Sequence, residues 1–246
     1  MTKRTGLMKT RIALIALAGL VSAATVLAAP PREYVFDTHP LSLKVSIKMV
    51  GPFMEPADLQ MICLFKHKAQ GDVYQGAARE TDEKLAGILS ALRNRGEFAG
   101  EMGETFLFTP ARDSIPARQF LIIGLGDEKD LSLDTLRLVG RVAAREATRL
   151  RARRIAWAPV IRDEGNTAID VGDGDRAFIE QMLSAYDTEK RLQAQGLAPR
   201  FDVESLVIEA GPAFFDSAVQ KVGDGIESET AELAKRDSSP FATTAK

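Results

Sequence analysis

Short apolar runs alternate along the chain with longer segments in which apolar positions recur every three or four residues. Residues 41–50, LSLKVSIKMV, alternate apolar and polar side chains, as expected for a strand with one buried face. Five further runs are rich in apolar residues and are bounded by turn-forming residues, which predicts strands. These runs are residues 57–66, 104–111, 118–126, 153–161 and 203–210.

Four segments show the periodicity of helices. The clearest covers residues 133–152, which carry an apolar stripe and follow Ser132, a candidate N-cap. Thr81 is a candidate cap for an earlier helix. The other predicted helices cover residues 82–96, 175–193 and 212–237, the last interrupted by Gly223 and Gly225. Because strands and helices alternate, the pattern predicts an α/β fold with a mixed, mostly parallel sheet flanked by helices on both faces.

The first 28 residues differ from the rest of the chain. Four basic residues precede the apolar run IALIALAGLVSAATVLAA, which ends in small residues, and this is the pattern of a secretory signal peptide. We expect cleavage after Ala28, and an uncleaved N-terminal anchor is the alternative. Residues 29–40 are proline-rich and predict an extended leader. Since no other segment is apolar enough to predict a membrane span, we expect an exported protein, periplasmic or secreted.

Charge and cysteine content narrow the classes of function. The 246 residues carry a formal net charge of −2. Residues 1–28 contribute four positive and no negative charges, so their removal leaves −6. A mildly acidic exported chain is not expected to bind nucleic acid. The single cysteine, Cys63, lies in an apolar run and is expected to be a buried free thiol, so no internal disulfide is possible.

Few residues offer catalytic or metal-binding chemistry. The two histidines, His39 and His67, have no ligand partner at helix spacing, which argues against a zinc site. The acidic segment 170–175 lacks the later glutamate of a calcium loop and is expected to be a solvated loop that caps the next helix. No serine stands in a nucleophile elbow, and Cys63 has no charged neighbour before Lys66. We therefore predict no catalytic residue, metal site or cofactor.

A glycine turn follows the apolar run in FLIIGLGDEKD, residues 120–130. Gly124 and Gly126 form a G-x-G pair, but the third glycine of a dinucleotide-binding loop is missing. Three carboxylates follow within four residues and would repel a pyrophosphate. The segment therefore predicts a turn between a strand and a helix rather than a phosphate loop.

Four arginines recur at four-residue steps along the helix predicted at 133–152. They are Arg137, Arg141, Arg145 and Arg149. This spacing places them on one ridge of the helix surface. The ridge is a candidate site for an anionic ligand or an acidic partner. The alternative, which the pattern favours, is a solvated face whose arginine stems lie over apolar neighbours.

The order of the segments resembles the N-terminal domain of the leucyl (cytosol) aminopeptidase family. The resemblance starts with residues 120–159, where a strand ending in G-L-G is followed by an acidic turn, a helix and another strand. It continues in AFIEQMLSAYDTEKRLQ, where Tyr186, Asp187 and Lys190 match a family motif, and in residues 218–246, which resemble the linker helix before the catalytic domain. The resemblance implies a macro-like domain at residues 41–210 and a linker-type helix with a frayed tail at 211–246.

The resemblance also implies what this chain lacks. The metal-binding motifs of the family's catalytic domain do not occur in the sequence, so no catalytic residue can be carried over. We expect a non-catalytic exported module that binds a peptidase subunit, another partner or itself. Two alternatives stay open: a binder of ADP-ribose, a nucleotide or another small anion in a macro-like cleft, and a fragment of a leucyl metalloaminopeptidase. The candidate cleft residues are Gly71, Asp72, Gly76, Gly124 and Gly126.

Overall fold

The computed structural model describes residues 31–236. The predicted signal peptide and the end of the predicted tail lie outside these residues. Among the described residues, no helix is both long enough and apolar enough to cross a membrane.

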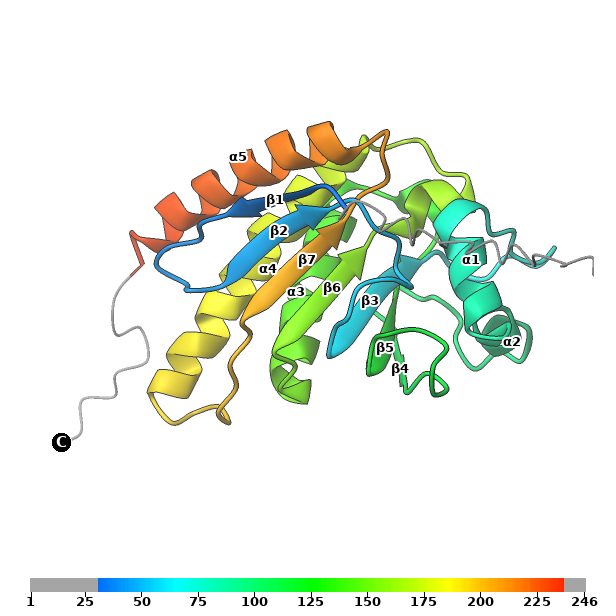
Figure 1. The fold of residues 1–246 in the computed structure, drawn as a ribbon, viewed down its shortest axis with the longest axis horizontal. Helices are drawn as coiled ribbons and strands as arrows, with labels where there is room; N and C mark the ends of the chain where they lie inside the picture. Colours follow the sequence, from blue (N-terminus) through cyan, green and yellow to red (C-terminus); the bar gives the residue numbers. More distant parts are fainter. Residues whose placement is uncertain (1–30, 237–246) are drawn as a thin grey trace, which may run out of the picture. The chain divides into compact units, whose positions relative to one another are not determined.

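A seven-stranded sheet forms the centre of the described domain (Figure 1). Its order is β1-β2-β7-β6-β3-β5-β4, in which the five central strands run parallel and the two edge strands pair antiparallel. The strands are β1 (Glu33–Phe36), β2 (Lys44–Lys48), β3 (Leu59–Leu64), β4 (Thr105–Phe108), β5 (Gln119–Gly124), β6 (Arg154–Ala158) and β7 (Ser205–Glu209). The predicted mixed, mostly parallel sheet is confirmed.

The central strands are apolar on both faces because helices cover both. Every residue of β3 is buried. Its Met61 and Cys63 belong to the larger core, which also contains residues of α3 (Leu133–Leu150), α4 (Val171–Ala194) and α5 (Phe215–Leu233). Ile62 and Leu64 point to the other face, where α1 (Gly76–Lys84) and α2 (Ile88–Asn94) pack. Figure 1 shows this division, with α1 and α2 beside β3, β5 and β4.

The helix predicted at residues 133–152 is present as α3, and Ser132 caps it. The Ser132 hydroxyl accepts a hydrogen bond from the Thr135 amide, and the Thr135 hydroxyl accepts one from the Ser132 amide. Gly140 lets α3 approach α4 closely, because an added Cβ would overlap the Phe178 carbonyl oxygen. Phe178 in turn stacks on Trp157 of β6, with ring centroids 4.4 Å apart. The close backbone approach therefore joins the two helices, and the aromatic stacking joins α4 to the sheet.

The prediction of one helix at residues 82–96, capped by Thr81, is wrong. Two helices are present, and the first begins at Gly76. Thr81 lies buried inside α1, where its hydroxyl donates to the Ala77 carbonyl at 2.6 Å. Ala86 and Gly87 both adopt positive φ angles, 57° and 78°, which ends α1 and separates it from α2. Apolar residues keep helical spacing across these two positions, so the sequence pattern does not show the break in the backbone.

Three other local predictions also differ from the structure. Part of the expected leader forms β1, which pairs with β2 at the sheet edge. The expected acidic loop at 170–175 is mostly helix, because Asp170 caps α4 by accepting from the Asp173 amide. Neither Gly223 nor Gly225 interrupts α5, and an added Cβ on Gly225 would lie 2.9 Å from Ile179 Cγ2, so this glycine serves helix packing.

Candidate functional site

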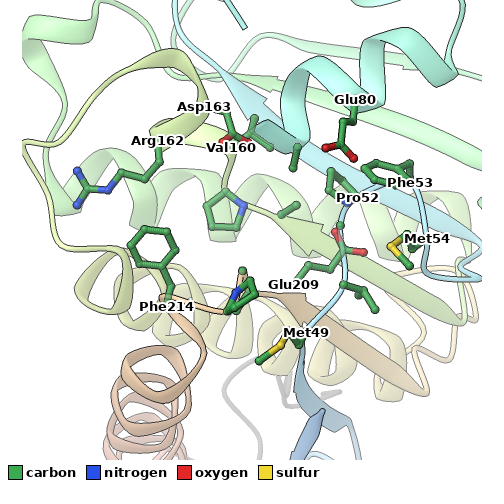
Figure 2. Close-up of a pocket in the computed structure, with 18 of the residues that line it drawn as sticks. Met49, Pro52, Phe53, Met54, Glu80, Val160, Arg162, Asp163, Glu209 and Phe214 are labelled. Carbon is green, nitrogen blue, oxygen red and sulfur yellow. The ribbon is translucent and has the colours of Figure 1, made fainter. Parts of the chain in front are cut away.

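A hollow of about 390 Å³ lies beyond the carboxyl ends of β2, β6 and β7 (Figure 2). Parallel strands expose their carboxyl ends at one edge of the sheet, and ligands of open α/β sheets bind at that edge. The loop after β2, the start of α1, the turn after β6, the start of α4 and the segment after β7 all contribute to the walls. A volume of this size suits a small organic ligand.

Apolar side chains form most of these walls. Met49, Phe53 and Met54 come from the loop after β2, Val160 follows β6, and Phe214 follows β7. Met54 is 54% exposed, so this part of the wall is open to solvent. The sheet topology brings these segments together, although Met49 and Phe214 are more than 150 residues apart in the chain.

Glu209 is the polar group that lines the base of the hollow. It is the last residue of β7 and is 5% exposed. Its Oε2 accepts a hydrogen bond from Gln60 Nε2 at 3.1 Å, whereas its Oε1 has no hydrogen-bond partner among the described residues. Figure 2 shows its side chain projecting toward the loop that carries Pro52 and Phe53. A buried carboxyl group with one unpartnered oxygen is costly and calls for an explanation.

The surroundings of Glu209 favour its neutral form. Burial raises its pKa to about 8, and the hydrogen bond from Gln60 only partly opposes this. Lys48 is directly opposite Glu209 in the register of β2 and β7, but its ammonium pairs with Glu55 at 2.6 Å. The cation that could have neutralised Glu209 is therefore committed to another carboxylate.

Two other charged residues of the hollow are engaged in structural contacts. The Asp163 carboxylate accepts a hydrogen bond from the Ala78 amide at 3.0 Å, in the first turn of α1. The Arg162 guanidinium donates to the carbonyls of Asn166 and Ile169, at 3.1 and 2.7 Å. Figure 2 shows the Arg162 side chain extending away from the other lining residues. Glu80 adds an exposed carboxylate at the rim, so the hollow is acidic as well as apolar.

A second set of buried polar groups, centred on Arg93, serves the fold. Arg93 is 2% exposed, donates from Nε to Asp72 at 2.7 Å, and also donates to the Phe65 carbonyl. Asp72 binds His67 Nδ1 at 2.8 Å. Burial raises the pKa of Asp72, but the hydrogen bonds from Arg93, His67 and Lys68 outweigh it and lower the pKa overall. This cluster ties the loop after β3 to α2.

Glu164 completes that cluster from the opposite side. Its carboxylate accepts from the Phe65 amide at 3.0 Å, and burial raises its pKa to about 8. The Phe65 backbone thus contacts an acid through its amide and Arg93 through its carbonyl. No group of three or more His, Cys, Asp or Glu side chains within residues 31–236 could hold a metal ion.

The candidate cleft residues from the sequence lie elsewhere, and none of them lines the hollow. Gly124 and Gly126 pack against the segment at residues 100–102, where an added Cβ on Gly124 would overlap the Glu101 carbonyl oxygen. Gly76 begins α1 next to Asp163. Gly71 lies in the loop after β3, as does Asp72, which is bound to Arg93.

The four arginines do lie along one helix, and each has a partner on α3 or α4. Arg137 pairs with Asp134 at 2.8 Å, and Arg149 pairs with Glu146. Arg141 donates to the Gln181 side chain at 3.1 Å, and Arg145 lies 3.9 Å from Glu189. These contacts neutralise much of the ridge and connect the two helices.

Sequence reasoning missed Glu209. Its one signal is its position as the charged residue that ends the apolar segment SLVIE. A glutamate at the end of a strand is ordinarily read as the point where the chain reaches solvent. Only the pairing of β7 between β2 and β6 shows that this carboxyl group is covered.

The fold is that of a macro-like α/β domain. A macrodomain of Oceanobacillus iheyensis with ADP aligns over 81% of this chain and 100% of its own, with a TM-score of 0.54 and 11% identity. A mutant of tomato leucine aminopeptidase aligns over 77% of this chain and 36% of its own, with a TM-score of 0.55 and 19% identity. At these identities, the likeness concerns the fold alone.

The family follows from the sequence match. Residues 61–189, more than half of the chain, match the model of the cytosol aminopeptidase family, N-terminal domain. The chain belongs to this family, which confirms the resemblance. A probable cytosol aminopeptidase of Thermosynechococcus vestitus is 28% identical over 149 residues, and one of Alkaliphilus metalliredigens is 33% identical over 103. These alignments cover 59% and 42% of this chain but only 29% and 20% of those proteins.

Proposed function

We propose that this chain is a non-catalytic, exported binding module that associates with a peptidase catalytic domain. The observation that carries the proposal is the family match, which falls in the N-terminal domain of a family of aminopeptidases. The chain spans less than a third of the length of the relatives named above. Association with a catalytic domain is therefore the function that best fits a domain of this family.

Export is supported by the pattern of residues 1–28. Basic residues, an apolar run and small residues at the expected cleavage position occur in the order that a secretory signal requires. Mass spectrometry of the chain from the periplasm or the medium tests this part of the proposal. A mature N-terminus at Ala29 is expected, whereas intact chain recovered only from the cytoplasm would contradict it.

Catalysis is tested with leucine p-nitroanilide and added manganese or zinc. We expect no turnover by the purified chain. Metal-dependent turnover that stays with the chain through successive purification steps would contradict the proposal and favour a metallopeptidase. Association is then tested by affinity capture from the exported fraction. Stoichiometric recovery of a peptidase is expected, and its absence would contradict a docking role.

The arginine ridge can be tested as the docking surface without disturbing the core. Arg145 is exposed and its pair with Glu189 is long, so its reversal is expected to cost less than about 1 kcal/mol of stability. The double variant Arg141→Glu, Arg145→Glu should release an acidic partner if the ridge binds it. Unchanged capture by this variant would remove the ridge as the docking surface.

A nucleotide or another phosphate-bearing ligand is less well supported by the hollow. The macrodomain in the comparison is described with ADP, but the fold likeness does not transfer that ligand. Glu80, Asp163 and Glu209 line the hollow here, and the Arg162 guanidinium is bound to backbone carbonyls. The exposed Glu80 carboxylate would repel phosphate groups, and the described lining offers them no free guanidinium.

A further inference from the structure

We propose that the hollow beyond β2, β6 and β7 binds a small primary amine with an apolar body, whose ammonium group hydrogen-bonds to Glu209. This inference is independent of the association with a peptidase, since it concerns a small ligand and can be tested on the chain alone. It rests on three features of residues 31–236: an unpartnered buried carboxyl oxygen, a neighbouring lysine that is paired with another carboxylate, and apolar walls.

The first feature is the half-satisfied carboxyl group. Gln60 occupies one oxygen of Glu209, while Oε1 has no partner among residues 31–236. An ammonium group carries three donors and can supply the missing hydrogen bond. Oε1 is itself covered, but the final torsion of a glutamate side chain is soft, and a small rotation can present that oxygen to the hollow.

The second feature is the charge balance around Glu209. Across the sheet, Lys48 is paired with Glu55, and Gln60 is neutral. Glu80 and Asp163 add negative charge, while the Arg162 guanidinium is engaged by carbonyls of the segment that follows it. A ligand cation would thus enter an acidic site without displacing a cation of the protein.

The third feature is the apolar lining. Met49, Phe53, Met54, Val160 and Phe214 surround the space beside Glu209. Burial of an alkyl chain against such side chains is favourable by about 0.8 kcal/mol for each methylene group. The lining therefore selects an amine with an apolar body over a hydrated inorganic cation. Such a cation would have to exchange its bound water molecules for a single carboxylate.

The test compares three probes of one shape: n-hexylamine, n-hexanol and hexanoate, titrated calorimetrically into the full chain at pH 9, where Glu209 is ionised and the amine is still protonated. We expect n-hexylamine to bind at least tenfold more tightly than either of the others. Hexanol binding as tightly as the amine would show an apolar site without a role for charge. Hexanoate binding more tightly, or no binding of the amine, would also overturn the proposal.

Variants identify the residue responsible. Glu209→Gln keeps the shape and the hydrogen bond with Gln60, and it should weaken n-hexylamine at least tenfold. Glu227→Gln makes the same change on an exposed residue of α5 and should leave the affinity within twofold. Met54→Arg places a cation at the exposed rim and should weaken the amine severalfold without disturbing the core. Unchanged affinity in Glu209→Gln, with its circular dichroism spectrum intact, would overturn the assignment.

Discussion

Glu209→Gln should increase the stability of the protein at alkaline pH and leave it nearly unchanged at acidic pH. Burial raises the pKa of Glu209 from an ordinary value of 4.5 to about 8. Between these values the folded chain keeps a proton that the unfolded chain releases, so stability falls as pH rises. Glutamine cannot ionise, and it can still accept the hydrogen bond from Gln60.

The magnitude follows from the pKa shift. One unit corresponds to about 1.4 kcal/mol, so the full shift would cost the native protein about 5 kcal/mol above pH 8. Relaxation around the ionised group reduces this figure, and we expect Glu209→Gln to gain about 2–5 kcal/mol at pH 9. Lys48 and Glu55 are present in both proteins, so their own ionisation largely cancels in the comparison.

The assay is urea unfolding at several pH values between 5 and 9, followed by the fluorescence of the single tryptophan, Trp157. Trp157 is buried against Phe178, and unfolding therefore changes its environment. Glu227→Gln serves as the control and should show a difference from the native chain that is small at every pH. A difference between Glu209→Gln and the native chain that stays constant across this range would refute the reasoning.

Three further predictions concern the fold. Gly140→Ala should destabilise the protein by about 2 kcal/mol or more in the urea assay, because the overlap with the α4 backbone outweighs the gain in helix propensity. Gly223→Ala is the control and should be neutral or stabilising, because the nearest atom to its added Cβ is a side-chain carbon at 3.2 Å. Arg93→Met should cost about 3–5 kcal/mol in that assay, since it removes the guanidinium that pairs with Asp72 and donates to the buried Phe65 carbonyl. A loss below about 1 kcal/mol would contradict the role of the pair. Burial raises the pKa of the Cys63 thiol. This thiol should therefore not react with Ellman's reagent until the chain is unfolded, and rapid labelling of the native protein would contradict its burial.

Much of the architecture was predictable because its signals are local. The six strands expected from apolar runs are all present, and Ser132 caps α3 as its position before an amphipathic stretch indicated. The sequence also contained the resemblance that the family match confirms. The signal peptide stays a prediction, since residues 1–28 lie outside those that the structure describes.

Local signals failed where the backbone or a distant element decided the outcome. The break between α1 and α2 depends on the positive φ angles of Ala86 and Gly87, which an apolar period does not encode. Glycine has a low helix propensity, but Gly225 lies inside α5, where its missing side chain leaves space for Ile179 of α4. The acidic segment at 170–175 is compatible with a loop or with the start of a helix, and the cap that Asp170 provides to α4 decides for the helix.

The sequence by itself determined the class of fold, the family and the lack of recognisable catalytic motifs, because these depend on the order and spacing of residues. Only the tertiary structure decided the chemistry of the hollow. Gln60 and Glu209 are 149 positions apart, and they meet because β3, β6, β7 and β2 are neighbours in the sheet. Strand order buries Glu209, and this burial raises its pKa. The pairing of Lys48 with Glu55 leaves Oε1 of Glu209 without a partner from the opposite strand. Desolvation depends on everything that surrounds a group in space, and for this reason no local pattern in the chain could have revealed it.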